Sequence, residues 1–131
     1  MTRPVKTLPA GAGQHATAGP YSPVLEIRAD RLVVISGQAP VDAAGTVIGD
    51  TIEAQTEVTL DNCLAQLRTA GCDFADVFKV NVYLRDLADW ERFNAVYLAT
   101  LPEPLPVRTA VQCGLLSDFL VEIEMWAGKR D

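Results

Sequence analysis

The sequence predicts a single two-layer α+β domain in which two helices cover one face of a mixed β-sheet. Three observations support this prediction. A chain of 131 residues that is 49% hydrophobic and 21% charged is typical of one globular domain, here residues 1–131. The elements follow the order β-β-β-α-β-α-β-β. Each helix and the central strand carry one apolar side, which they must bury against each other.

The first elements are expected to be strands. Residues 24–28 and 31–36 are apolar, β-branched runs separated by Ala29 and Asp30, a pattern typical of a β-hairpin. A turn-rich segment follows and contains a short third strand at residues 46–48. The sequence thus predicts three strands before the first helix.

A long first helix follows these strands. Asp50, with Glu53 three residues later, predicts a capping box at its start, and Gly71 predicts its C-terminal cap. Apolar residues recur at helical spacing between these two ends, and they are expected to face the core. They are Ile52, Leu60, Cys63, Leu64 and Leu67.

The next strand and helix alternate in the same way. In "DVFKVNVYLRD", Phe78, Val80, Val82 and Leu84 are expected on one side, and Lys79, Asn81 and Tyr83 on the other. A second helix is predicted from Asp86, with Asp89 behind it, to about Ala99. Its aromatic side is expected to belong to the core and consists of Trp90, Phe93 and Tyr97.

Two closing strands, at residues 107–113 and 120–127, complete the sheet. In the last strand, Glu122, Glu124 and Trp126 share the side opposite to the apolar one. Such a mixture of carboxylates and large apolar groups fits a subunit interface or an ordinary wet sheet face. Composition does not decide between these alternatives.

Charge and cysteine content exclude several function classes. Eleven Lys and Arg against seventeen Asp and Glu give a net charge of −6 without a basic stripe, so nucleic acid is not expected as a partner. Three cysteines without a CxxC pair, and a single histidine, His15, predict reduced thiols, no metal site and no His-dependent triad. The N-terminus has no apolar signal region and no window spans a membrane, so we expect a soluble cytoplasmic protein.

Arg108 is the most unusual residue of the chain. It lies within "PLPVRTAVQ", which otherwise reads as a buried strand. Burying an unpaired guanidinium is costly, so an anionic partner is expected from the protein or from a ligand. An internal salt bridge to Glu122 or Glu124 is the alternative to a ligand.

Further short stretches are weak signals when taken singly. Tyr21 in "AGPYSP" can be a packing residue of a turn, and Gly37 in "SGQ" can simply permit a bend. Asn94 in "FNAVY" can be a solvated helix residue.

Taken together and in this order, these stretches with "PVRTAV" and "VEIE" resemble the YjgF/YER057c/UK114 family, also called the reactive intermediate deaminase (Rid) family. The resemblance covers nearly the whole chain. It implies a chorismate-mutase-like α+β fold and a homotrimer whose sheets meet around a central barrel. It also implies hydrolysis of 2-imino acids and their enamine tautomers to 2-keto acids and ammonia, without a cofactor, in pockets between subunits.

The resemblance also implies roles for individual residues. Arg108 corresponds to the arginine that binds the substrate carboxylate, and Glu122 to the glutamate that positions or activates water. Tyr21, Gly37, Asn94 and Ala110 correspond to positions that line the pocket and bind substrate. Ala110 replaces the cysteine of the best-known members.

Other departures affect the expected substrate. The segment between Asn94 and Arg108 and the turn "CGLLSD" are both shorter than usual, which reshapes a pocket wall. Two alternatives therefore stay open. One is a pathway-specific relative that acts on aminoacrylate or 2-aminomuconate, and the other is a non-catalytic trimer that binds small carboxylates. Relatives described as ribonucleases or translation inhibitors fit the acidic charge poorly.

Overall fold

The computed structural model describes residues 5–16 and 19–131. In these ranges the elements, in chain order, are β1 (Lys6–Thr7), β2 (Glu26–Ile27), β3 (Arg31–Gln38), α1 (Ile52–Thr69), β4 (Val77–Leu84), α2 (Trp90–Thr100), β5 (Val107–Gln112) and β6 (Val121–Lys129), with 3₁₀ turns at Phe74–Asp76 and Leu87–Asp89. The predicted order of strands and helices is confirmed, but one of the three strands before α1 is not the one predicted. Lys6–Thr7 was not predicted, whereas residues 46–48 are not a strand and contribute only an isolated bridge between Val41 and Val47.

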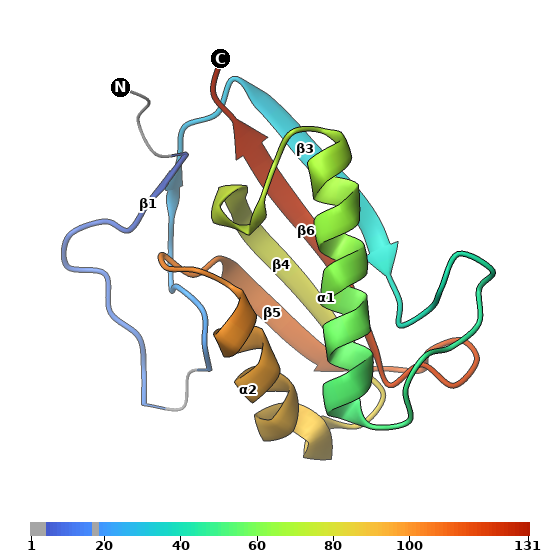
Figure 1. The fold of residues 1–131 in the computed structure, drawn as a ribbon. Coiled ribbons are helices and arrows are strands. Elements are labelled where there is room, and N and C mark those ends of the chain that lie inside the picture. Colours follow the sequence, from blue (N-terminus) through green and yellow to red (C-terminus); the bar gives the residue numbers. More distant parts are fainter. Residues whose placement is uncertain (1–4, 17–18) are drawn as a thin grey trace.

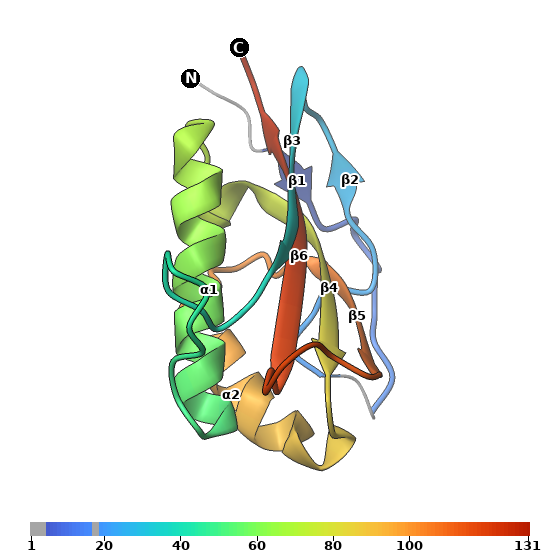
Figure 2. The same ribbon diagram turned by 90° about the vertical axis from the view of Figure 1, so that its right-hand side faces the viewer.

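The main sheet has four strands in the order β3-β6-β4-β5. β4 pairs with β5 in parallel, and the other pairs are antiparallel, so the sheet is mixed as predicted. Helices α1 and α2 lie side by side over one face of this sheet (Figure 1), and the view along the sheet shows the two layers (Figure 2). We call the opposite face the open face.

The predicted hairpin between residues 24–28 and 31–36 is wrong. β2 pairs with β1 in a separate two-stranded ribbon, whereas β3 lies beside β6, with Arg31 opposite Lys129. The Asp30 amide donates a hydrogen bond to the Lys129 carbonyl and leads the chain into the main sheet. Alternating apolar residues indicate a strand but do not determine its partner.

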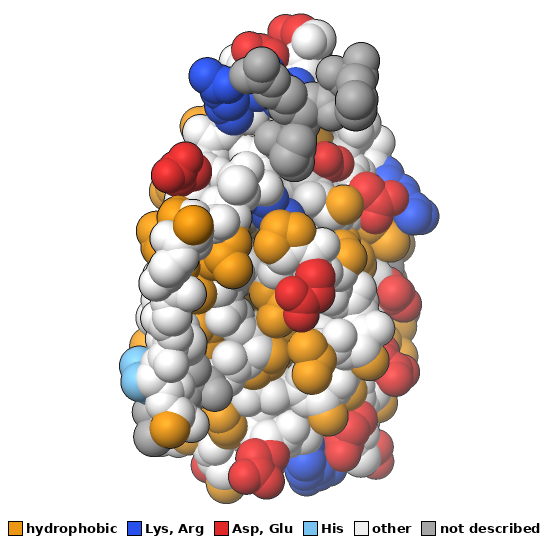
Figure 3. Space-filling model, turned by 90° about the vertical axis from the view of Figure 1, so that its left-hand side faces the viewer, with side chains coloured by type: hydrophobic (Ala, Val, Ile, Leu, Met, Phe, Trp, Pro, Cys, Tyr) orange, Lys and Arg blue, Asp and Glu red, His pale blue; other side chains and the backbone are white. Residues whose placement is uncertain are grey.

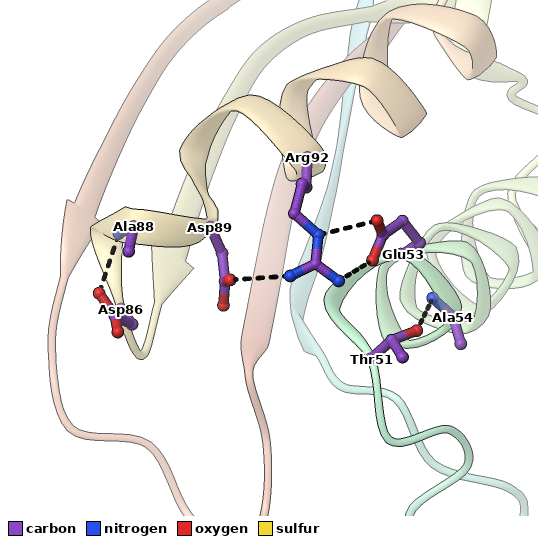
Figure 4. Close-up of polar contacts among 7 residues, drawn as sticks. All are labelled: Thr51, Glu53, Ala54, Asp86, Ala88, Asp89 and Arg92. Atoms are coloured by element: carbon purple, nitrogen blue, oxygen red, sulfur yellow. Dashed lines mark hydrogen bonds and ion pairs between the residues drawn. The ribbon is translucent and has the colours of Figure 1, made fainter.

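The cap at the start of α1 also differs from the prediction. The N-cap is Thr51, whose hydroxyl accepts a hydrogen bond from the Ala54 amide, so the capping box at Asp50 is wrong. Glu53 instead accepts two hydrogen bonds from the Arg92 guanidinium, at 2.6 and 2.8 Å. Figure 4 shows this bidentate pair joining the first turns of α1 and α2. The pair is half exposed and links the two helices at their N-terminal ends.

The C-terminus of α1 is a Schellman motif. Ala70 is the C-cap residue, and Gly71 follows it with a φ of +78°. The Cys72 amide donates to the Leu67 carbonyl at 3.0 Å, and the Gly71 amide donates to the Arg68 carbonyl at 3.1 Å. Gly71 thus ends the helix as expected, one position beyond the cap residue itself.

The core fills the space between the helices and the sheet. One of its strand positions differs from the prediction, because an irregularity between Val77 and Lys79 puts Val77 into the core in place of Phe78. The core residues of the four-stranded sheet include Ile35, Val80, Val82, Leu84, Val121, Ile123, Met125 and Ala127, and those of the helices include Ile52, Leu60, Cys63, Leu67, Phe93 and Tyr97. Across residues 5–16 and 19–131, helices of the length and apolar character that a membrane crossing requires are absent.

Candidate functional site

Arg108 lies on β5 beside Val80 of β4, and its side chain points toward the helical layer. It is 8% exposed. Four aromatic rings surround its guanidinium carbon, at 4.9 to 5.7 Å from their centroids. We call these rings the aromatic cluster; they belong to Tyr21, Trp90, Phe93 and Tyr97.

The guanidinium of Arg108 has no hydrogen-bond acceptor among residues 5–16 and 19–131. Nε, Nη1 and Nη2 are all buried, and no described residue accepts a hydrogen bond from any of them. The alternative of an internal salt bridge to Glu122 or Glu124 is therefore wrong. Burial lowers the pKa of Arg108 while Tyr97 and Tyr21 act in the opposite direction, and an arginine stays charged across the physiological range. The cluster thus holds a cation whose five N–H groups still need acceptors.

Helix α2 carries further polar atoms on the side that faces the cluster, because Asn94 lies one helical turn from both Trp90 and Tyr97. Asn94 Oδ1 and the Tyr97 hydroxyl are buried and have no hydrogen-bond partner in the described part of the chain. Phe93 stacks on Tyr97 with ring centroids 5.8 Å apart, and burial raises the pKa of the Tyr97 hydroxyl. A ligand that satisfies this site would offer acceptors to Arg108 and a donor to Asn94.

The segment from Gly19 to Ser22 covers the guanidinium. A Cβ on Gly19 would lie 3.1 Å from Arg108 Nη2 and 3.1 Å from a ring carbon of Trp90, so a side chain here would crowd the site. Ser22 anchors the segment, because its hydroxyl donates to the Leu105 carbonyl at 2.5 Å. Ala18, the first residue of the "AGPYSP" stretch, lies outside the described residues.

A cavity of about 490 Å³, open to solvent, shares Trp90 with the aromatic cluster around Arg108. We call it the side-chain cavity; its lining residues are Leu87, Ala88, Trp90, Glu91 and Ala110. Ala110 follows Arg108 by two residues on β5 and therefore shares its face of the sheet. Figure 3 shows the side of the molecule on which the N-terminal segment lies, with hydrophobic side chains gathered around a hollow.

Glu122 lies on the open face. Its neighbours on β6, Val121 and Ile123, are fully buried on the helix side, so Glu122 points the other way. Gly37 of β3 is next to it, because a Cβ on Gly37 would lie 2.6 Å from Glu122 Oε2. Gly37 and Glu122 therefore lie side by side on the open face.

The six candidate residues thus form two groups in one chain. Arg108, Tyr21, Asn94 and Ala110 line the helix side of the sheet at the β5 edge, and Gly37 and Glu122 lie on the open face. A single chain does not bring Arg108 and Glu122 together. A site that uses both needs more than one copy of the chain.

The open face also contains Tyr83, Glu124, Lys79 and Trp126, which were expected on the polar sides of their strands, but their contacts were not predicted. Tyr83 donates a hydrogen bond to Glu124, which raises the pKa of Tyr83 to about 12. The Lys79 ammonium lies 6.0 Å from the centroid of Trp126. Leu32 and Val34 are 63% and 58% exposed, so the face is apolar as well as charged.

The aromatic cluster was only partly foreseen. Trp90, Phe93 and Tyr97 were interpreted as core residues, which is correct for the latter two, but their contact with Arg108 was missed. Helical spacing puts these three residues on one side of α2, but the sequence pattern does not indicate which strand residue packs against that side.

The three cysteines are free thiols, as predicted. Burial raises the pKa of the Cys63 thiol to about 12, so it behaves as a core residue and not as a nucleophile. Within residues 5–16 and 19–131, no group of His, Cys, Asp and Glu side chains is arranged to hold a metal ion.

Comparisons with known proteins identify the relatives of this chain. The family model described as Endoribonuclease L-PSP matches residues 12–129. The chain belongs to this family. It is the YjgF/YER057c/UK114, or Rid, family that the sequence resembles.

Family members align over most of this chain. A RutC family protein of Pyrococcus horikoshii is 41% identical over 113 residues, which cover 85% of this chain and 88% of that protein. Reactive Intermediate Deaminase A, a chloroplastic protein of Arabidopsis thaliana, is 35% identical over 111 residues, 83% of this chain and 58% of that protein. The crystal structure of RidA from an Antarctic Psychrobacter has a TM-score of 0.71 at 36% identity and covers 86% of this chain and 91% of its own. The α+β fold is thus that of the Rid family.

Proposed function

We propose that the protein hydrolyses 2-imino acids and their enamine tautomers to 2-keto acids and ammonia, in clefts between the subunits of a homotrimer. The observation that carries this proposal is the guanidinium of Arg108, which is buried, unpaired and surrounded by aromatic rings. A planar carboxylate accepts two parallel hydrogen bonds from such a fork. The family relative named Reactive Intermediate Deaminase A supports the choice of reaction.

The polar atoms of the site match the reactive part of a 2-imino acid. The carboxylate binds to Arg108, and Asn94 Oδ1 accepts a hydrogen bond from the N–H of the imine or enamine. Water attacks the carbon of the C=N bond while Glu122 accepts one of its protons. The nitrogen takes up protons and leaves as ammonia, and the carbon retains the water oxygen as the 2-keto group. Fixed orientation of carboxylate and water supplies the rate gain.

The assembly follows from the two groups of residues. Because Glu122 lies on the open face and Arg108 on the helix side, we propose that a second subunit brings its Glu122 to the Arg108 cleft. The exposed apolar residues of the open face suit burial in such a contact, and Val34, at 58% exposed, lies on β3 at its edge. Three copies whose open faces meet would form the central barrel.

Clearance of imines tests the proposed reaction. Imines are generated in place by an amino-acid oxidase, and semicarbazide traps whatever remains. Wild-type protein should lower the trapped product, whereas Arg108→Ala should not. Arg108→Lys keeps the charge but loses the fork, so we expect most of the activity to be lost there too. Undiminished clearance by a folded Arg108→Ala variant would contradict the proposal.

A non-catalytic trimer that binds small carboxylates is the second candidate. It is favoured by the observation that, in the described part of the chain, no carboxylate accepts a hydrogen bond from Arg108. Glu122→Gln separates the two candidates. In an enzyme it should abolish imine clearance, whereas a binding protein clears no imine with or without the change and should keep its keto-acid affinity.

A further inference from the structure

We propose that the side-chain cavity receives the side chain of the substrate and makes the protein selective for large apolar 2-imino acids, of leucine to phenylalanine size, over the alanine-derived imine. This inference rests on the proposed function, because Arg108 must hold the carboxylate. It adds the substrate class, which follows from the shape and chemistry of the cavity and not from the reaction.

The position of the cavity relative to Arg108 supports this assignment. Arg108 and Ala110 point to the same side of β5, and two residues along a strand span about 6.6 Å. In a 2-imino acid the side chain is attached to the imine carbon, which is bonded directly to the carboxylate carbon. A carboxylate held by Arg108 therefore places the side chain within reach of Ala110. Trp90 links the two, since its ring lies 5.1 Å from the guanidinium and also lines the cavity.

The walls of the cavity determine which side chains fit. Leu87, Ala88, Trp90 and Ala110 are apolar, and the small side chain of Ala110 leaves room that a larger residue would fill. Among the described lining residues Glu91 alone is charged, and its carboxylate opposes an acidic side chain. A methyl side chain would leave most of the about 490 Å³ to water, whereas a leucine or phenylalanine side chain would bury apolar surface there.

One oxidase can supply all the substrates of the test. D-amino-acid oxidase converts D-alanine, D-leucine and D-phenylalanine to the same imines that the L-amino acids give, because the imine carbon is not chiral. Clearance is measured by semicarbazide competition, and the quantity compared is the ratio of kcat/KM for the leucine-derived imine to that for the alanine-derived imine. We expect a ratio of roughly ten or more. A ratio of one or less would overturn the inference while leaving the proposed function intact.

Two variants change the cavity in different ways. Ala110→Leu fills it and Leu87→Ala removes part of its apolar wall, so each should bring the ratio toward one. Leu87 is 44% exposed, so its replacement is not expected to affect folding even if Ala110→Leu does. Leu98→Ala is the matched control, because Leu98 is 54% exposed on α2 and does not line the cavity. An unchanged ratio in both cavity variants would overturn the inference.

Keto-acid binding makes the result independent of turnover. Thermal stabilisation of the wild type is compared for pyruvate, 4-methyl-2-oxopentanoate and 2-oxoglutarate at equal concentration. We expect the branched keto acid to stabilise most and 2-oxoglutarate least, and Leu87→Ala to reduce this difference. If no imine is cleared but this order holds, the proposed function fails and the cavity assignment stands. Equal stabilisation by all three would overturn the assignment.

Discussion

Arg108 shows how one residue can indicate a ligand. A cation buried without an anionic partner is costly, and here its five donors face aromatic rings instead of carboxylates. The rings compensate the charge in part through cation–π attraction and form no hydrogen bonds with the N–H groups. The sequence predicted that Arg108 needs an anionic partner, because arginine is rare in an apolar strand. It did not identify the surrounding rings, which come from residues 11 to 87 positions away in the chain.

Replacement of Gly37 tests the role of the Glu122 carboxylate. In Gly37→Ala, the new Cβ would lie 2.6 Å from Glu122 Oε2, so the flexible carboxylate has to move. We expect kcat to fall about 10- to 100-fold, because a displacement of about 1 Å is enough for such a loss. The free energy of unfolding in urea should change by less than about 1 kcal/mol. Gly114→Ala is the control, as nothing lies within 4 Å of its Cβ position, and equal activities of the two variants would contradict this role.

Lys6 predicts a dependence of stability on pH. Lys6 is 4% exposed and its ammonium donates to the Val77 carbonyl at 2.7 Å; burial lowers the pKa of Lys6 from 10.5 to about 8, although Asp76 opposes this shift. Between pH 8 and 10.5 the unfolded chain binds more protons at this site than the folded chain. The Lys6 contribution to the free energy of unfolding therefore rises with pH across this window and is least favourable below pH 8.

Lys6→Met isolates this contribution. The advantage in unfolding free energy of the variant over the wild type should be largest at pH 7 and should shrink by roughly 1–3 kcal/mol at pH 10. Urea denaturation of both proteins at each pH gives this difference, and other titrating groups cancel from it. A difference that is constant from pH 7 to 10 would show that the pKa of Lys6 is not lowered.

Elements differ in how far the sequence determines them. Strand β6 and the apolar side of α1 were predicted well, because alternation and helical spacing act within one element. The 24–28 segment was assigned the wrong partner, and Phe78 the wrong side, because pairing and strand irregularities depend on segments far away in the chain. The strand that actually pairs with β2 is β1 at Lys6–Thr7, which was not predicted. Local patterns therefore give the elements, and long-range packing gives their pairing.

Arg85 predicts how one loop supports the site. Its guanidinium donates to the carbonyls of Phe119, Leu115 and Ser117 at 2.6 to 2.9 Å and holds the loop that leads into β6, close to Glu122. Arg85→Lys cannot reach all three carbonyls, so we expect about 1 kcal/mol less stability. The loop should then position Glu122 less well, with kcat about tenfold lower and KM nearly unchanged.

Arg68→Lys is the matched control for this loop. Arg68 is also exposed and makes one ion pair, at 3.3 Å to Asp73, so this variant should resemble the wild type in urea denaturation and in imine clearance. If Arg85→Lys raised KM and left kcat unchanged, the loop would act on substrate binding and not on Glu122.

The whole molecule explains why the site could not be completed from one chain. Alternation along β5 and β6 already implies that Arg108 and Glu122 lie on fixed sides of the sheet, but only the strand order and the helix positions show that the sides are opposite. The resemblance to the family supplied the expectation of pockets between subunits. The separation of the two residues gives that expectation a physical reason, since the sheet itself lies between them.

Mixing two inactive variants tests this reason directly. If each site takes Arg108 from one chain and Glu122 from its neighbour, Arg108→Ala and Glu122→Gln are each inactive as homotrimers. Unfolded together in equal amounts and refolded, the two variants assort at random, so about a quarter of all the sites in the resulting trimers receive both native residues. We therefore expect about a quarter of the wild-type imine clearance to return, whereas separately refolded samples mixed afterwards stay inactive. Mixed trimers, verified by mass, that show no recovery would mean that Arg108 and Glu122 do not act together across a subunit contact.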